Sequence, residues 1–480
     1  MEQHGADVIV VGAGVVGRSV AWALASGRPG LRVVLSGRQG AGASEAAGAM
    51  LGALGEVTEA SLTRPHGRLR VEMALEAARR WPRWRDAVHG AAGAGAGPGG
   101  DGYATGTFVL LNAVSSPLDE RSFAAIARAG RRYGVPVEEV EPAEVPAVRP
   151  LDNERPLRAL HLPDEGFLDA RRWLASLDAA LDALPNVTRV PAAPLRTSGS
   201  GYVLEAPHRL VAAPAVVLAA GAWTGPLAEA LDPDLMLMPV ATAEGTAVSV
   251  AAPAPLPAVL RTPNRAYACG LHAVPQADGS WYLGATAAPA LDPGDAPQLG
   301  GVRFLLDAAL GQLHHGLTTA RLHRLHHGNR PIGLDGHPLI GATSRPGLWV
   351  ATGTHRDGLH ASPLIAQELA GEILDGTPSR WLAPWRPERA PISDWTVQEA
   401  VAEAAAHHQA LAAEARMRPP LTGAWPQALA DAYQQQLADH YSRLPEGFVL
   451  PPELAPLAYE HATALAKSIL DHLHRREFGR

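Results

Sequence analysis

A glycine fingerprint near the amino terminus constrains the fold of this chain more than any other feature. Gly12, Gly14 and Gly17 stand between a β-branched apolar run at residues 7–11 and a helical pattern at residues 15–26. In this context glycines permit a tight turn, and N–H groups at the start of the helix can bind a pyrophosphate. The sequence therefore predicts a Rossmann-type dinucleotide-binding unit.

The residue that follows the expected second strand, at residues 31–35, is Ser36. The fingerprint asks for an acid about 20 residues after the glycines, where it binds the ribose hydroxyls of the adenosine. A small residue at this position, with Arg38 nearby, is also what a site for the 2′-phosphate of NADP would contain. An NADP-dependent dehydrogenase therefore stays open as an alternative.

Small side chains fill residues 42–53. Such a run lets a flat ring system approach the main chain closely, as glycine does generally. An alanine-rich helix is the alternative explanation of the same residues.

Two later segments each place an arginine among turn-forming residues. Arg330 lies in a glycine- and proline-rich stretch at residues 327–341, and a guanidinium held there offers two parallel donors suited to a carboxylate. Arg356 lies in the stretch 351–358, where a glycine turn precedes a helical pattern whose amino end could face a flavin ring. Arginine in a loop is most often only solvated, but the rigid surroundings favour binding roles for both.

Composition excludes several functional classes. The 480 residues carry a formal net charge of −7, and no run of basic residues is interleaved with aromatic ones, so nucleic-acid binding is not expected. The one cysteine, Cys269, excludes an internal disulfide and suits a reducing compartment. No leader or membrane-spanning run is recognisable, so we expect a soluble, cytoplasmic protein of at least two domains, for which a homo-oligomer is left open.

The remaining patterns predict further elements. Apolar runs indicate buried strands at residues 215–220 and 348–352, and a helix is expected at residues 363–374. Alternation around an Asp-Gly turn predicts a hairpin at residues 270–286, and residues 90–102 are expected to form a flexible loop.

Beyond Pro384 the composition changes, and helical spacing indicates an appendage of three helical stretches. They are expected at residues 395–417, 424–443 and 452–476.

Taken together, these motifs resemble the D-amino-acid oxidase (DAO) family of FAD enzymes, and within it the glycine oxidases. The resemblance runs from about Val8 to about Gly376. It is carried by the glycine fingerprint and by segments 47–53, 217–223, 273–275 with 284–286, 329–331 and 353–358, with Glu56 after the first of these segments.

The resemblance implies an α/β fold with a discontinuous FAD-binding domain (1–95, 155–235 and 326–380), an antiparallel-sheet substrate domain (96–154 and 236–325) and a helical extension (381–480). It implies noncovalent FAD, a small amino-acid or amine substrate whose α-carbon gives a hydride to flavin N5, and oxygen as electron acceptor. Arg330 matches the arginine that binds the substrate carboxylate, Arg356 a second arginine beside flavin and substrate, and His272 replaces a tyrosine near that carboxylate. The residues expected at the cofactor are Gly12, Gly14, Val15, Val16, Gly17, Ser36, Arg38, Ala43, Ser44, Ala47, Gly48, Ala49, Met50, Leu51, Gly221, Trp223, Gly353, Thr354, His355, Arg356, Asp357 and Gly358.

Several positions depart from the family pattern. Ser36 replaces the ribose-binding acid, Glu244 interrupts a usual basic-Gly-Gln pattern, and His360 stands where an apolar residue is usual. Histidines are dense between residues 323 and 360, but their spacing matches no standard zinc pattern, so no metal is expected. These late histidines are His323, His326, His327, His337, His355 and His360. A third alternative is therefore a flavin-binding protein that has lost catalysis.

Overall fold

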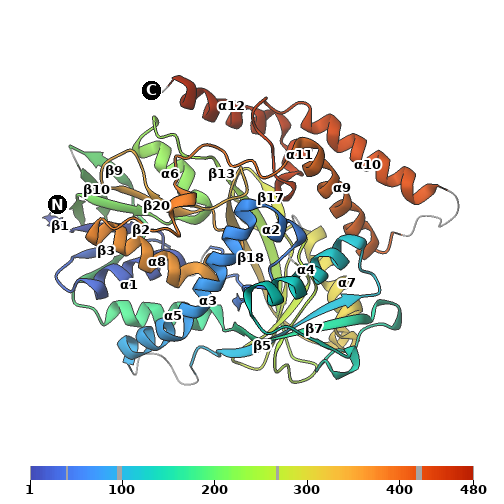
Figure 1. Ribbon diagram of the computed structural model, residues 1–480. Coiled ribbons are helices and arrows are strands. Elements are labelled where there is room, and N and C mark those ends of the chain that lie inside the picture. Colours follow the sequence, from blue (N-terminus) through green and yellow to red (C-terminus); the bar gives the residue numbers. More distant parts are fainter. Residues whose placement is uncertain are drawn as a thin grey trace.

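The computed structural model of this protein describes residues 2–38, 42–93, 100–199, 201–265, 270–417 and 424–478. Cys269 and the centre of the loop expected at 90–102 lie outside these residues. Figure 1 shows sheets flanked by helices, with the C-terminal helices α9, α10 and α12 gathered along one side.

Among the described residues, a mainly parallel sheet of six strands contains the glycine fingerprint's βαβ unit. Its strand order is β19-β20-β12-β2-β3-β8, and only the pairing of β19 with β20 is antiparallel. The βαβ unit predicted from the glycine fingerprint supplies β2, α1 and β3, which confirms the Rossmann-type α/β expectation. The strands are β2 (Val8–Val11), β3 (Val33–Ser36), β8 (Val187–Val190), β12 (Ala215–Leu218), β19 (Leu339–Ala342) and β20 (Leu348–Thr352).

The two faces of this sheet bury different cores. Successive side chains of a strand point to opposite faces, so Val8 and Val10 of β2 contact one core while Ile9 and Val11 contact the other. Helices cover the first face, as their apolar sides share its core. They are α1 (Val15–Gly27), α3 (Pro65–Ala92), α5 (Ala170–Asp182) and α8 (Gly358–Asp375).

Helix α8 begins at Gly358, five residues before the start expected from the sequence. Pro363 has no N–H to donate to the carbonyl oxygen of Leu359, one turn earlier. The hydroxyl of Ser362 donates to that oxygen at 2.9 Å instead. The helix therefore continues through the proline that the sequence pattern predicts as its first residue.

A second, larger sheet lies beside the parallel sheet and is mainly antiparallel. Its main path is β17-β13-β16-β15-β14-β5-β7-β4; β18 pairs with β13, β6 pairs with β7, and only β14 and β5 run parallel. The expected hairpin is present as β15 and β16. The strands are β4 (Met50–Leu51), β5 (Ala104–Asn112), β6 (Glu138–Val140), β7 (Pro156–Phe167), β13 (Val240–Val250), β14 (Val259–Arg261), β15 (His272–Pro275), β16 (Trp281–Gly284), β17 (Ala288–Ala290) and β18 (Leu322–Gly333).

The strands β4, β7 and β18 do not follow the domain boundaries predicted from the sequence. They fall wholly or partly in ranges assigned to the cofactor domain, yet they pair within the larger sheet. Helices α2 (Glu59–Thr63), α4 (Pro117–Tyr133) and α7 (Leu299–Gln312) pack against the larger sheet. Helix α6 (Thr224–Leu231) packs instead on the second face of the parallel sheet. A small sheet adds β1 (Glu2–Gly5), β9 (Leu195–Ser198), β10 (Gly201–Ala206) and β11 (Arg209–Ala213).

The C-terminal region is helical, as the sequence predicts, and we call residues 381–480 the C-terminal extension. Its helices are α9 (Val397–Glu414), α10 (Trp425–Tyr441), α11 (Leu457–Glu460) and α12 (Ala462–Phe478). Apolar residues of these helices share one buried core with the second face of the parallel sheet and with β10 and β11. In the part of the chain that the structure describes, no helix is long and apolar enough to cross a bilayer.

Candidate functional site

A cavity of about 620 Å³ opens at the carboxyl ends of the parallel strands. This is where open α/β sheets bind ligands, and the volume suits a large cofactor together with a small substrate. Its lining comes from the turns after β2, β3, β12 and β20, from segment 42–50 and from the larger sheet.

Of the residues predicted from the sequence, all but three line this cavity. The three exceptions are Gly17, Leu51 and Gly353. A Cβ on Gly17 would lie 1.8 Å from the carbonyl oxygen of Gly12. Leu51 is buried in the core, and the main chain turns at Gly353, where φ is +71°. The predicted residues that do line it are Gly12, Gly14, Val15, Val16, Ser36, Arg38, Ala43, Ser44, Ala47, Gly48, Ala49, Met50, Gly221, Trp223, His272, Arg330, Thr354, His355, Arg356, Asp357 and Gly358.

The start of α1 is open toward the cavity. The main chain at Gly12 adopts φ +121°, and a Cβ there would lie 2.2 Å from the carbonyl oxygen of Ala219 on the neighbouring strand's turn. Gly14, at the N-cap, carries no side chain, and the Val15 N–H donates to the Ser44 hydroxyl at 3.0 Å. The amino end of a helix that no charged side chain caps is suited to a pyrophosphate.

Ser36 lines the cavity, and its hydroxyl donates to the carbonyl oxygen of Pro191 at 3.0 Å. That proton is therefore not available to a ribose or a phosphate, and the Ser36 oxygen can only accept a hydrogen bond. Arg38 is exposed at the rim.

A second helix start reaches the same cavity. Thr354 to Gly358 line it just where α8 begins, and Asp357 at the N-cap accepts a hydrogen bond from Arg70 at 2.7 Å without capping the helix itself. The positive end of α8 therefore faces the cavity, where it can stabilise negative charge on a flavin pyrimidine ring. Together the two helix starts and the small residues of segment 42–50 fit FAD.

Arg330 enters the cavity from β18. One guanidinium nitrogen, Nη1, donates to the carbonyl oxygen of Thr286 at 3.0 Å. The guanidinium crosses Gly245 of β13 so closely that a Cβ at Gly245 would lie 2.4 Å from it. The absence of a side chain on β13 thus creates the space in which Arg330 lies, a role that the sequence did not reveal.

His272 is buried in the cavity wall on β15 and stacks with Tyr282. Burial lowers the pKa of His272 to about 4, an effect that outweighs its contact with the Gly270 carbonyl oxygen at 2.9 Å. At neutral pH the ring is therefore uncharged. Because a carbonyl oxygen only accepts, Nδ1 carries the proton and Nε2 is left as an acceptor. A neutral histidine of this tautomer cannot donate from Nε2 as a tyrosine hydroxyl would.

The depressed pKa of His272 predicts a loss of stability in mild acid. The unfolded chain takes up a proton near pH 6.5 but the folded one only near 4, so stability falls as the pH drops through this interval. At pH 5 the cost is about 2 kcal/mol. Urea unfolding of the FAD-loaded protein at pH 7 and 5 should therefore show a drop that is smaller by about this amount in His272→Asn.

The control for this measurement is His208→Asn, since His208 is exposed at a turn. An equal drop between pH 7 and 5 in the wild type and in His272→Asn would contradict the neutral state of the buried ring.

Tyr282 and Glu56 complete the chemistry of the wall. The Tyr282 hydroxyl donates to the carbonyl oxygen of Ala46 at 2.7 Å, which holds the segment of small residues in place. Nothing in the sequence indicates this contact beyond the presence of an aromatic residue in the expected hairpin. Although burial raises it, the pKa of Glu56 is lowered to about 2 by Arg261 and Arg356. Arg261 donates to Glu56 at 2.7 Å. The cavity therefore holds a fixed carboxylate beside Arg356, whose Nη2 donates to the Arg265 carbonyl oxygen at 3.2 Å.

The late histidines do not assemble a metal site. No group of three or more His, Cys, Asp or Glu side chains suited to a metal ion occurs among the described residues. His326 instead contacts the Ser249 hydroxyl at 2.8 Å, His327 the Gly294 carbonyl oxygen at 3.2 Å, and His360 the Ala74 carbonyl oxygen at 2.8 Å.

Comparison with known proteins identifies relatives for most of the chain. Residues 7–372 match the family described as FAD dependent oxidoreductase (DAO). The glycine oxidase of Geobacillus kaustophilus is 31% identical over 388 residues, which cover 80% of this chain and 96% of the relative. The glycine oxidase of Bacillus licheniformis is 25% identical over 396 residues, covering 80% and 97%.

Solved structures agree with the fold. The crystal structure of glycine oxidase from Geobacillus kaustophilus superposes with a TM-score of 0.68 at 28% identity and covers 81% of this chain and all of that one. An iminodiacetate oxidase from Chelativorans sp. BNC1 gives 0.64 at 22% identity, covering 80% of this chain and 100% of that one. The helices α9 to α12 lie beyond the residues matched by the family.

Proposed function

Because this chain belongs to the DAO family of FAD-dependent oxidoreductases, we propose that it oxidises the C–N bond of a small amino acid or amine. The observation that carries this proposal is the position of Arg330 in the cavity that the open starts of α1 and α8 also reach. A cofactor and a carboxylate would then be held side by side. The similarity to glycine oxidases supports an α-amino acid as substrate.

The residues of this chain then have distinct tasks. The turn at Gly12 and the start of α1 would hold the pyrophosphate of noncovalently bound FAD, and the start of α8 would face its flavin ring. The Arg330 guanidinium binds the substrate carboxylate through the donors that Thr286 leaves free. His272, through Nε2, accepts a hydrogen bond from the substrate rather than donating one.

Bound FAD supplies the redox chemistry by accepting a hydride from the substrate α-carbon at N5. The protein positions that carbon and excludes water, so it needs no acid–base pair at the carbon itself. The imine that results hydrolyses to a carbonyl compound and ammonia or an amine. Transfer of the two electrons and of two protons to oxygen would then give hydrogen peroxide.

We further propose that residues 1–95, 155–235 and 326–380 form the FAD-binding domain and residues 96–154 and 236–325 the substrate domain, with Arg330 reaching the substrate from the FAD-binding domain. The alternative of an NADP-dependent dehydrogenase has little support. Ser36 uses its hydroxyl proton on Pro191, and the family to which the chain belongs uses FAD.

Anaerobic mixing of the purified yellow protein with glycine, sarcosine and a panel of D- and L-amino acids tests the proposal. At least one should bleach the flavin absorbance, and air should then restore the colour with release of hydrogen peroxide. A yellow protein that no member of the panel bleaches would support the alternative of lost catalysis. A colourless protein that binds only NADP would refute the cofactor assignment.

A further inference from the structure

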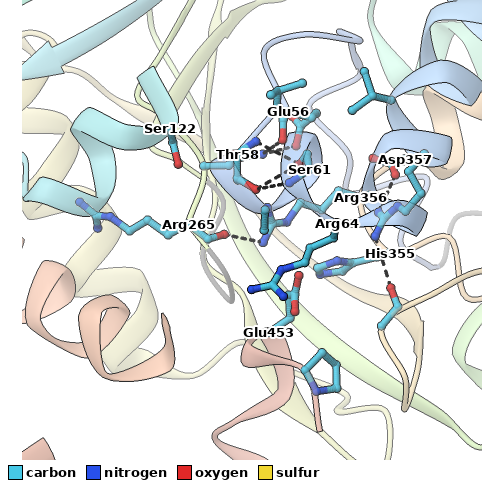
Figure 2. A pocket seen from close by; sticks show the side chains of 18 of the residues that line it. Glu56, Thr58, Ser61, Arg64, Ser122, Arg265, His355, Arg356, Asp357 and Glu453 are labelled. Carbon is cyan, nitrogen blue, oxygen red and sulfur yellow. Dashed lines mark hydrogen bonds and ion pairs between the residues drawn. The ribbon is translucent and has the colours of Figure 1, made fainter. Parts of the chain in front are cut away.

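A second, smaller cavity of about 130 Å³ adjoins the first one. The two share Gly52, Glu56, His355, Arg356 and Asp357 in their walls. Figure 2 shows the second cavity, with His355 and Arg356 entering from the loop before α8 and Glu453 from the C-terminal extension. Five residues thus border both cavities, whereas Arg330 lines only the larger one.

The C-terminal extension contributes Trp395, Glu403, Pro451 and Glu453 to the wall of the second cavity. These residues lie beyond the part of the chain that the family matches, which ends at residue 372. The second cavity is thus formed in part by a region that the family relationship does not explain.

The arginines that line this cavity already face acidic partners. Arg64 pairs with Glu399 at 3.0 Å, and Arg70 pairs with Asp357 at 2.7 Å.

Arg265 is matched twice, by Asp119 at 2.8 Å and by a closer contact with Glu414 of α9. Arg356 interacts favourably with the Glu56 carboxylate. Each guanidinium group of this wall therefore already interacts with a carboxylate of the protein, so the wall is not suited to an anionic ligand.

The carboxyl of Glu453 is attracted by Arg70 and Arg356 but is not paired with either of them. Its Oε2 is buried without a hydrogen-bond partner, and no ion pair with a described residue reaches it. Burial raises the pKa of Glu453, because the lowering by Arg70 and Arg356 is the smaller effect.

Glu403, from α9 in the same wall, meets Arg121 only at 3.6 Å. Burial raises its pKa as well. Five carboxyl groups and four guanidinium groups of the described residues line this cavity, so a cationic ligand complements its wall better than an anionic one.

We propose that the second cavity binds the cationic end of an extended substrate, a primary ammonium or a guanidinium, with Glu453 as its acceptor. This rests on the proposed function, because it places the oxidised end of the same molecule at Arg330. The substrate is then an α-amino acid with a basic side chain or a carboxylate-bearing diamine, rather than glycine. The cavity admits the end of a side chain and no larger group.

Calorimetric titration of the FAD-loaded protein, without oxygen, tests the site independently of turnover. The probes are 4-aminobutanoate, 5-aminopentanoate and 6-aminohexanoate, each compared with the carboxylate of equal chain length that lacks the amine. The proposal expects the amine to lower Kd by about tenfold or more for at least one length, since a charge-assisted hydrogen bond to a carboxylate is gained. Equal Kd values within each pair, at every length, would overturn it.

Glu453→Gln keeps the shape of the side chain and removes its charge. In this variant the advantage of the amine should shrink to about threefold or less. The matched control is Glu446→Gln, because Glu446 is exposed on the same extension. An advantage that survives in Glu453→Gln would show that another group binds the amine and would refute the role of Glu453.

Activity separates this inference from the proposed function. If no amino acid bleaches the flavin but the amine advantage is measured and depends on Glu453, the oxidase proposal fails while the cation site stands. If small neutral amino acids are oxidised and no amine advantage exists, the reverse holds.

Discussion

Replacing Gly12 with alanine should yield a protein without bound flavin. The added Cβ would lie 2.2 Å from the Ala219 carbonyl oxygen and 2.8 Å from the Ala220 nitrogen, and the main chain at φ +121° is one that L residues rarely adopt. Both obstacles are main-chain atoms, so no rotamer relieves them. We expect a cost of about 4 kcal/mol or more, seen as a lower thermal midpoint and as loss of the flavin absorbance.

Gly14→Ala provides the contrast. A Cβ at Gly14 meets only the Ser44 hydroxyl, at 3.3 Å, and the main chain there has an ordinary φ of −73°. This variant should keep a thermal midpoint close to that of the wild-type apoprotein while FAD binds more weakly. Equal flavin content and stability in Gly12→Ala and the wild type would contradict the tight turn described here.

Replacing Arg330 with alanine should raise the KM of a carboxylate-bearing substrate without removing the flavin. A charge-assisted contact contributes about 1.5 to 3 kcal/mol, which corresponds to roughly a 10- to 150-fold loss in substrate binding. Steady-state kinetics on the best substrate of the panel, with the flavin content of each preparation recorded, provide the measurement. Arg324→Ala is the control, because Arg324 is exposed on the same strand.

Gly245→Ala tests the same contact from the other strand. Its Cβ would displace the guanidinium of Arg330, which is the end of a flexible side chain, so the fold should tolerate the change. We therefore expect a raised KM with nearly unchanged thermal stability. An unchanged KM in both Arg330→Ala and Gly245→Ala would remove Arg330 from the substrate site.

The sequence predicted the fold best where local pattern and tertiary structure agree. The strand, glycine turn and helix at residues 8–27 could be read directly, because each piece has its own periodicity. The expected strand at 348–352 has the observed bounds for the same reason. The start of α8 was misplaced because Pro363 looks like a first residue unless the Ser362 hydroxyl contact is known.

The site was predictable in outline and not in its electrostatics. Most residues expected at the cofactor do line one cavity, since the turns after parallel strands meet at one edge. The sequence could not show that Ser36 uses its hydroxyl proton on Pro191 or that Gly245 makes room for Arg330. Nor could it show that Glu453 lies in a wall near Arg356, some hundred positions earlier in the chain. Such facts depend on contacts between distant segments.

The core behind the parallel sheet joins Ile9 of β2 to Ile469 of α12. During synthesis, β2 leaves the ribosome long before its last packing partners exist, and domains generally fold as their chain emerges. The second face of the parallel sheet therefore stays partly exposed until the helices of the C-terminal extension, almost the last part of the chain, have been synthesised. The yield of folded protein on expression should therefore rise with added chaperones and at low growth temperatures, at which translation is slow. This dependence should be stronger than the close packing of the folded protein alone suggests.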